Sequence, residues 1–129
     1  MRLSFSVSNQ SVYPLKEKKI YLVTLYFPEI KPAQLEYCEV SHRTLFIHLT
    51  RGKVLECIGS LDELSKQLIP YGSFLRPHRS YLANLEYIQE LSYRAITMSC
   101  LAEIPIPRGK YNEIKNAFLE YAFLNRDVT

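Results

Sequence analysis

The sequence contains no tryptophan, only four glycines and three cysteines, and no long apolar run. A membrane-spanning helix needs about 18 or more consecutive apolar residues, and no window of this chain approaches that length. Residues 1–10 also lack the apolar core of a secretory signal peptide. Cys38, Cys57 and Cys100 are odd in number and show no C-x-x-C spacing, which favours reduced thiols. These absences predict a cytoplasmic protein.

Signatures of catalysis and of metal binding are missing too. Ser41 lies beside His42, but no triad spacing and no nucleophile elbow accompany the pair. Cys38 and His42 supply too few ligands for a zinc site, and the chain has neither a Walker loop nor a dinucleotide fingerprint. The sequence therefore predicts a protein that is not an enzyme and holds no metal or cofactor.

What the chain does contain is a high content of strand-forming residues. Ten tyrosines and six phenylalanines favour strands over helices, and 129 residues suffice for one domain with its own core. Alternating or β-branched patterns bounded by Gly, Pro and polar residues predict the individual strands. The predicted strands are residues 2–8, 19–27, 35–40, 44–49, 54–58, 81–91, 95–99 and 102–106, the last at a sheet edge because prolines limit it.

Two helices are expected among these strands. Ser60 and Glu63 form a capping box at the start of a short helix, whose leucines share one face and which ends at Pro70 and Gly72. A second helix is predicted over residues 110–124, where an apolar stripe at helical spacing indicates core packing. Between residues 44–49 and 54–58, Thr50 to Lys53 supply a hairpin turn. The fold class is therefore mainly β, with one short internal helix and a C-terminal helix.

Charge is segregated along the chain. The net charge is only +3, too small to prove a nucleic-acid partner. Three windows, residues 40–55, 65–85 and 104–112, contain no acid, yet they hold eight of the sixteen Lys and Arg and all three His. A mixed solvated surface would not require this separation.

The most informative segment is FLRPHRSYLANLEYI, residues 74–88. Arginines at the start of a strand, anchored by buried neighbours, can present guanidinium groups to phosphates or base edges. A surface loop whose arginines pair with carboxylates is the alternative. The segment resembles the F-x-R-x-H-R-S-x-x-V-N signature of the LytTR family of DNA-binding domains. The matching residues are Phe74, Arg76, His78, Arg79, Ser80 and Asn84, with Ala83 in place of the usual Val.

Further landmarks of that family occur in the right order. They are a strand resembling Y-x-E in residues 35–39, a Gly-containing hairpin in 48–55, the helix start S-L-x-E-L in 60–64 and an I-P element in 104–111. Two positions depart from the pattern: Pro107 replaces the usual Ser, and residues 100–102 replace a Gly-containing turn. The resemblance implies antiparallel strands in small sheets. It places the DNA-binding domain at residues 19–124, after an extension (1–18) and before a tail (125–129).

The resemblance also implies which residues meet DNA, since loops at one edge of the LytTR fold enter successive major grooves. It assigns His42 to a base edge and Arg43 to a phosphate. Arg79 and Arg108 are candidates for base reading, because Arg donates two hydrogen bonds to guanine. The remaining candidates are Lys110, close enough in sequence to touch the DNA backbone, and Arg76, which either contacts phosphate or braces its loop.

Structural roles are expected for several neighbouring polar residues. His78 is interpreted as bonding the loop backbone, and Asn84 as tying down the strand. His48 is expected on a solvent face. The run Lys16 to Lys19 reads as a solvated charge cluster that could add non-specific phosphate contact.

The function that follows is a sequence-specific, double-stranded-DNA-binding transcriptional regulator that reads direct-repeat promoter sites and pairs on DNA. Eighteen residues are too few for a receiver domain ahead of the match. The chain is therefore expected to be either a stand-alone regulator, controlled by a partner such as a membrane inhibitor, or a fragment of a longer one. The alternative is a protein-interaction module with weak or no specific DNA binding, and a redox switch through Cys57 or Cys100 is a third reading.

Overall fold

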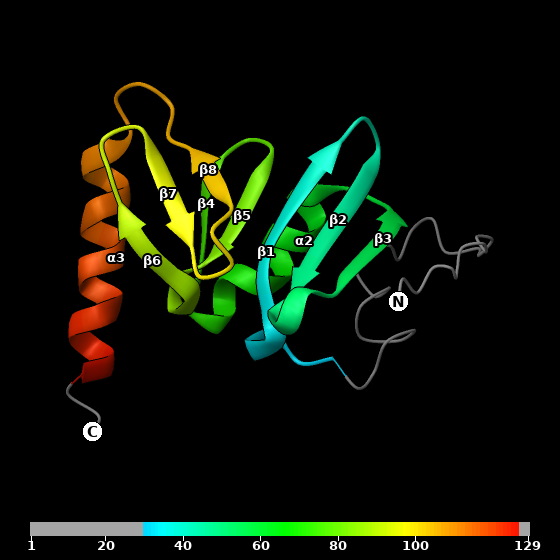
Figure 1. Cartoon of the computed structure of the whole chain (residues 1–129), viewed down its shortest axis with the longest axis horizontal. Coiled ribbons are helices and arrows are strands. Elements are labelled where there is room, and N and C mark those ends of the chain that lie inside the picture. The colour runs from blue at the N-terminus through cyan, green and yellow to red at the C-terminus, as the bar shows by residue number, and fades with distance from the viewer. Residues whose placement is uncertain (1–29, 127–129) are drawn as a thin grey trace.

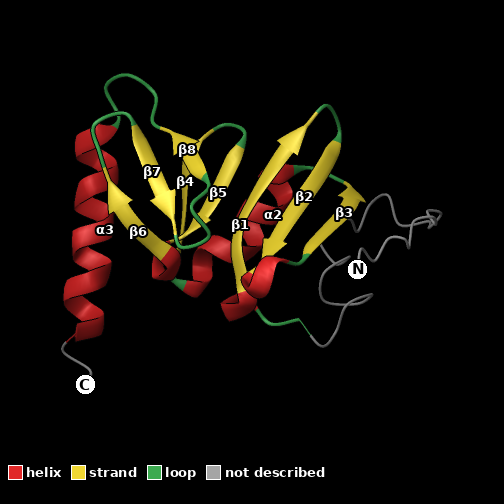
Figure 2. Cartoon of the chain, in the orientation of Figure 1, coloured by secondary structure: helices red, strands yellow, loops and turns green. Residues whose placement is uncertain are grey.

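The computed structural model of the chain describes residues 30–126 (Figure 1). The expected strands at residues 2–8 and 19–27, and the lysine run at 16–19, lie outside the described residues. The described part is mainly antiparallel β, with two sheets and a C-terminal helix, as the sequence predicted (Figure 2). None of its helices combines the length and apolarity needed to cross a lipid bilayer.

The larger sheet has five strands in the order β3-β2-β1-β5-β4. Strands β1 (Leu35–Ser41), β2 (Thr44–Leu49) and β3 (Val54–Ile58) agree closely with the predicted strands. Burial alternates along β2, whereas residues 35–38 of β1 are buried on both faces. A one-turn 3-10 helix, Pro32–Gln34, precedes β1. Thr50–Gly52 joins β2 to β3, and Gly52 takes a φ of +80° that few side chains adopt.

Helix α2 (Leu61–Leu68) covers one face of this sheet. The Ser60 hydroxyl accepts a hydrogen bond from the backbone N–H of Glu63 at 3.3 Å, which confirms the predicted helix start. The helix leads into a 3-10 turn, Ile69–Tyr71, which Gly72 closes at a φ of +89°. The buried leucines of α2 pack against β1, β2 and β3 in a first hydrophobic cluster, whose members include Leu61, Leu64, Leu68, Leu35, Ile47 and Leu55.

The prediction of one continuous strand over residues 81–91 is wrong. The segment forms β5 (Tyr81–Asn84), a 3-10 turn (Leu85–Tyr87) and β6 (Ile88–Leu91), and the two strands belong to different sheets. Asn84 makes the break, because its side-chain oxygen accepts from the N–H of Glu86 at 2.9 Å and starts the turn.

Strand β4 (Phe74–His78) was not among the predicted strands. It contains Pro77, which cannot donate to a sheet ladder and argues against a strand in sequence. The structure accommodates it because β4 is the last strand of its sheet, and its pairing with β5 shifts register between Leu75 and His78.

The smaller sheet has the order β6-β7-β8, with β7 at Ala95–Met98 and β8 at Glu103–Pro105. Strand β8 lies at the sheet edge, as its prolines predicted. Helix α3 (Tyr111–Arg126) lies at the far side of this sheet (Figure 1). A second hydrophobic cluster fills the space between them, and its members include Ile96, Met98, Ile104 and Ile114, with Phe118 and Tyr121 packed against it.

Strands β1 and β5 contribute to both clusters. Neighbouring side chains point to opposite faces of a strand, so Leu82 joins the first cluster and Ala83 the second. The buried carboxylate of Glu36 adds a polar tie, since it accepts a 2.8 Å hydrogen bond from the backbone N–H of Cys100 after β7. The two sheets are therefore packed and bonded into one body.

Candidate nucleic-acid interface

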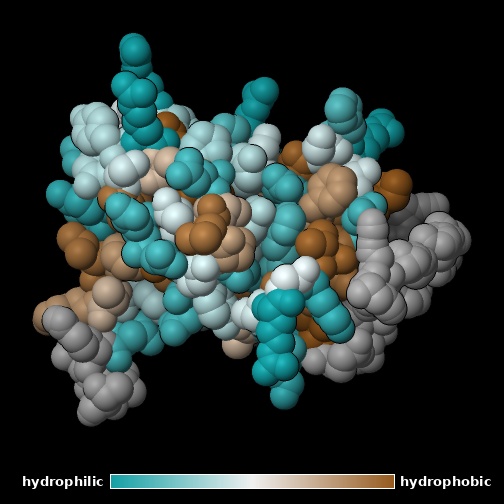
Figure 3. Space-filling model, viewed as in Figure 1, coloured by the Kyte–Doolittle hydropathy of each residue, from teal (hydrophilic) through white to brown (hydrophobic). Residues whose placement is uncertain are grey.

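Four connections lie along one edge of the molecule, the upper edge in Figure 1. They are the β1–β2 turn (residues 42–43), the β4–β5 turn (79–80), the β6–β7 turn (92–94) and the β8–α3 loop (106–110). Three of these carry the residues that the sequence predicted for DNA contact. Hydrophilic side chains project from the same edge in Figure 3. The fold thus brings together segments that are far apart in sequence.

Backbone hydrogen bonds join these connections in pairs. The N–H of Val40 donates to the carbonyl of Ser80 at 3.0 Å, which fixes the β4–β5 turn beside the end of β1. The N–H of Ile106 donates to the carbonyl of Arg94 at 2.8 Å, which fixes the β6–β7 turn beside the start of the β8–α3 loop. The position of each turn is therefore set by the sheets and not by the turn alone.

The β1–β2 turn presents His42 and Arg43, both exposed. Strand pairing continues to Ser41 and Thr44, so only two residues remain for the turn. His42 adopts a φ of +56°, a left-handed conformation that is uncommon for residues other than glycine and typical of tight hairpin turns. Its ring Nδ1 lies 3.4 Å from the Ser41 hydroxyl. This short turn leaves both side chains beyond the end of the sheet.

The β4–β5 turn presents Arg79, whose side chain is exposed. His78 lies just before it, and its Nδ1 accepts a hydrogen bond from the N–H of Ser80 at 3.0 Å. The His78 ring also meets Tyr81 edge-on, with 5.5 Å between ring centroids. The prediction that His78 has a structural role in this loop is confirmed.

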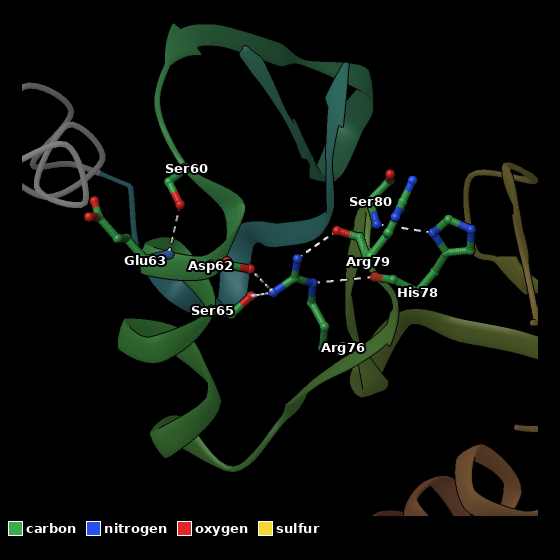
Figure 4. A network of polar contacts seen from close by, with 8 residues as sticks. All are labelled: Ser60, Asp62, Glu63, Ser65, Arg76, His78, Arg79 and Ser80. Atoms are coloured by element: carbon green, nitrogen blue, oxygen red, sulfur yellow. Dashed lines mark hydrogen bonds and ion pairs between the residues drawn. The ribbon is translucent and has the colours of Figure 1, made fainter. Parts of the chain in front are cut away.

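Arg76 lies behind this turn, and Figure 4 shows its guanidinium among protein acceptors. It contacts the carboxylate of Asp62 at 2.9 Å and the hydroxyl of Ser65 at 3.2 Å, both on α2. It also donates to the carbonyls of His78 at 3.3 Å and Arg79 at 2.5 Å. Only 24% of its side chain is exposed. Of the two roles expected for Arg76, these contacts favour the brace.

A hollow of about 420 Å³ lies between the β6–β7 turn and the β8–α3 loop. Arg94 and Arg108 line it from opposite sides. The rings of Tyr93 and Tyr111 lie beside them, with 4.8 Å between ring centroids. Lys110 is exposed nearby, and its ammonium lies 3.6 Å from the carboxylate of Glu113. Two guanidinium groups at one concave surface can hold a phosphate through charge-assisted hydrogen bonds.

Arg94 was not predicted as a site residue. It lies outside the three acid-free windows considered in the sequence, although residues 91–102 contain no acid either. A usable signal was present in composition, since Arg94 is the only Lys or Arg in the acid-free residues 91–102. Strand direction would not have found it, because the continuous strand expected over residues 81–91 puts residues 92–94 at the opposite end from Arg79. The break at Asn84 reverses the chain and brings Arg94 to the same edge as Arg79.

Two other polar residues discussed in the sequence, Asn84 and His48, make contacts within the fold. Asn84 is 1% exposed and bonded on both sides of its amide, which confirms the expected tie. His48 does not simply face solvent: its ring stacks on Tyr37 with 4.1 Å between centroids, and its Nε2 lies 3.2 Å from Glu39. This stack fixes His48 within the sheet, away from the turns.

The three cysteines are free thiols. Burial raises the pKa of Cys57 to about 12 and raises that of Cys38 further, and it also raises the pKa of Cys100. A thiol reacts as its thiolate, so these environments suppress reactivity. Within residues 30–126 no group of three His, Cys, Asp or Glu side chains is arranged to hold a metal ion.

Comparison with known proteins identifies the fold. Residues 27–119 match the family model described as the LytTr DNA-binding domain. A segment of 63 residues is 38% identical to the sensory transduction protein LytT of Oceanobacillus iheyensis; it covers 49% of this chain but only 25% of that protein. This chain thus aligns with about a quarter of the length of its curated relative.

A solved structure shares the same architecture. It is the LytTr DNA-binding domain of a Bacillus cereus protein described as a methyl-accepting/DNA response regulator. The match has a TM-score of 0.56 at 20% identity and covers 70% of this chain and 84% of that domain. The family model spans well over half of the chain, in agreement with the F-x-R-x-H-R-S segment and the antiparallel fold. The chain belongs to the LytTR family of DNA-binding domains.

Proposed function

We propose that the chain is a sequence-specific, double-stranded-DNA-binding transcriptional regulator that meets major grooves with the four connections of its upper edge. The observation that carries this proposal is the placement of exposed basic side chains on that edge. Residues 42–43, 79–80, 92–94 and 106–110 contain no acid. A row of cations without acids is the electrostatic footprint expected of a DNA-binding surface.

The side chains divide into two classes of contact. Arg79 and Arg108 suit base reading, because a guanidinium donates two parallel hydrogen bonds to guanine O6 and N7. Pro107 restricts the backbone ahead of Arg108, which limits the backbone conformations that the loop must give up on binding. His42 is a third candidate for a base edge. Arg43, Arg94 and Lys110 suit phosphates, which fix orientation without reading sequence.

We further propose that two copies occupy adjacent direct repeats in promoters and that another protein, such as a membrane-anchored inhibitor, controls the chain. We assign DNA binding to residues 19–124 and cytoplasmic action to the regulator. The names of the similar proteins, a sensory transduction protein and a response regulator, support a regulatory role.

The alternative is a protein-interaction module built on the same fold. One observation favours it. Helix α3 exposes apolar side chains away from the second cluster: Leu119 is 52% exposed, Phe123 63% and Leu124 57%. Exposed apolar residues grouped on one helix are typical of contact surfaces for other proteins. The two readings differ in whether the basic edge selects DNA sequences.

Selection from genomic DNA fragments tests the proposal. Wild type, Arg79→Ala and Lys53→Ala are compared at about 150 mM salt, where weak non-specific binding is suppressed. Lys53 is an exposed cation beside the β2–β3 turn, at the opposite end of the sheet (Figure 1). We expect wild type and Lys53→Ala to enrich the same repeated motif and Arg79→Ala to lose it. Recovery of random DNA by wild type would reject sequence reading and favour the protein-interaction module.

A further inference from the structure

The β4–β5 turn has a polar attachment to helix α2 that DNA contact by itself does not require (Figure 4). Arg76 has five N–H donors, and four contacts to protein acceptors surround its guanidinium. Two acceptors belong to the turn, the carbonyls of His78 and Arg79, and two belong to α2, Asp62 and Ser65. Arg76 therefore joins the turn to the helix.

The turn needs these donors for a physical reason. Pro77 has no N–H, and pairing between β4 and β5 shifts register between Leu75 and His78, so the regular ladder is interrupted before the turn. The contact to the His78 carbonyl is partly buried, and a buried carbonyl left without a partner costs about 1–3 kcal/mol. The guanidinium supplies partners to the carbonyls of His78 and Arg79 and thereby fixes the backbone from which the Arg79 side chain projects.

Asp62 fixes the guanidinium in turn. Asp62 and Ser65 are three residues apart and so share one face of α2, and both contact Nη1 of Arg76. The adjoining face of α2 is held in the first hydrophobic cluster by Leu61, Leu64 and Leu68. The orientation of the turn is thus fixed relative to the hydrophobic core through one ion pair and a set of hydrogen bonds.

We infer that Asp62 is a positioning residue for the base-reading turn, acting through Arg76, and that Arg76 is a brace and not a phosphate contact. This inference rests on the proposed DNA-reading function. The negative charge of Asp62 distinguishes a positioning role from a purely electrostatic one. Removing an acid from a DNA-binding protein should tighten binding to every sequence by electrostatics alone, whereas removing a positioning acid should weaken binding to the specific site only.

The test compares variants of Asp62 with a neighbour of equal charge. Glu63 is also exposed on the first turn of α2, its side chain points away from Arg76 in Figure 4, and among the described contacts none joins the two. We expect Asp62→Ala to weaken the specific complex about tenfold, near the effect of one lost charge-assisted hydrogen bond, with non-specific binding unchanged or tighter. Glu63→Ala should not weaken it. Asp62→Asn, which keeps an acceptor oxygen at the same charge as Asp62→Ala, should lose less.

Variants of Arg76 provide a second test of the same inference. A brace predicts that Arg76→Lys fails like Arg76→Ala, because an ammonium cannot reach four acceptors, and that neither variant changes the salt dependence of binding. A phosphate contact predicts that Lys substitutes well and that Arg76→Ala lowers the salt slope by about one. In the Arg76→Ala background, Asp62→Ala should have no further effect; additive losses would overturn action through Arg76.

A measurement without DNA separates this inference from the proposed function. Trypsin cleaves after exposed Arg79 when the turn opens, so cleavage there should be several-fold faster in Asp62→Ala than in Glu63→Ala, with cleavage after Lys53 unchanged. Equal rates at Arg79 would overturn the brace whatever the DNA experiments show. Faster cleavage in a protein that selects no DNA sequence would establish the brace, reject the proposed function and with it the role of Asp62 in reading.

Discussion

The side-chain amide of Asn84 donates a 2.8 Å hydrogen bond to the backbone carbonyl of Leu35, across 49 positions of sequence. Both residues are buried, and the Asn84 oxygen accepts from the N–H of Glu86 at 2.9 Å. A single side chain therefore joins the start of β1 to the turn that leads from the larger sheet into the smaller one.

We expect Asn84→Ala to lower the free energy of unfolding by about 2–4 kcal/mol, because it removes two hydrogen bonds and leaves the buried Leu35 carbonyl without its partner. Urea titration measures this. Asn116→Ala, an exposed change on α3, is the matched control and should stay within about 0.5 kcal/mol of wild type. Equal stability of the two variants would contradict the structural role of Asn84.

Base reading predicts sequence-dependent losses at the upper edge. Arg79→Ala and Arg108→Ala should each weaken the specific complex by about 1–3 kcal/mol and relax preference at one base pair, while non-specific binding falls less. Fluorescence anisotropy with the selected site and with scrambled DNA measures both. Lys53→Ala controls for the lost charge. Equal losses on both duplexes would reduce these arginines to phosphate contacts.

Arg94 should behave differently from Arg108 although both line the same hollow. As a phosphate contact, Arg94→Ala should weaken binding to all sequences by a similar factor and lower the salt slope by about one. Binding at several salt concentrations measures the slope. A loss confined to the selected site, with the slope unchanged, would instead indicate base reading by Arg94.

The thiols give a prediction on reactivity. At about pH 8 a free thiol is partly ionised, but burial raises the pKa of Cys38 and Cys57. We expect iodoacetamide to modify exposed Cys100 first, and Cys38 and Cys57 only when urea unfolds the protein. Mass spectrometry of peptides follows each site. Rapid modification of Cys57 in the folded protein would revive a redox role.

Stability should decrease at alkaline pH. Burial and the hydrogen bond to Glu86 raise the pKa of Tyr121 to about 12 from 10.0. The unfolded chain therefore loses this proton first, so the contribution is complete below pH 10 and declines as the pH rises towards 12. Urea unfolding of wild type and Tyr121→Phe measures it: the stability of wild type should fall more steeply over that range. Parallel curves would contradict the raised pKa.

Local signals were enough to predict much of the fold. Alternation predicted β2, short strand-forming runs bounded by turn residues predicted β1 and β3, and the Ser60 cap predicted the start of α2, because short-range sequence signals determine these elements. The break at Asn84 was not predictable in this way. Apolar residues continue past it, and the interaction that stabilises it comes from Leu35, far away in sequence.

The candidate site was predictable in part for a similar reason. Sequence identified the turns that contain His42, Arg79 and Arg108, but their common edge follows from the order and direction of strands in two sheets. Arg94 was missed because the continuous strand expected over residues 81–91 puts it at the opposite end from Arg79, and only the break at Asn84 brings the two to one edge. The contact between Arg76 and Asp62 joins segments fourteen positions apart and has no local signature.

The shared core of the two sheets has a consequence for any duplex that lies along the upper edge. Strand β5 places Leu82 in one cluster and Ala83 in the other, so the turns at the two ends of the edge cannot move apart without disrupting close packing. Under the proposed function, the DNA must then adapt its curvature to the protein. Bending energy depends on sequence, and pyrimidine–purine steps deform most easily. Flexible steps between contacted bases will strengthen binding at positions that no side chain touches.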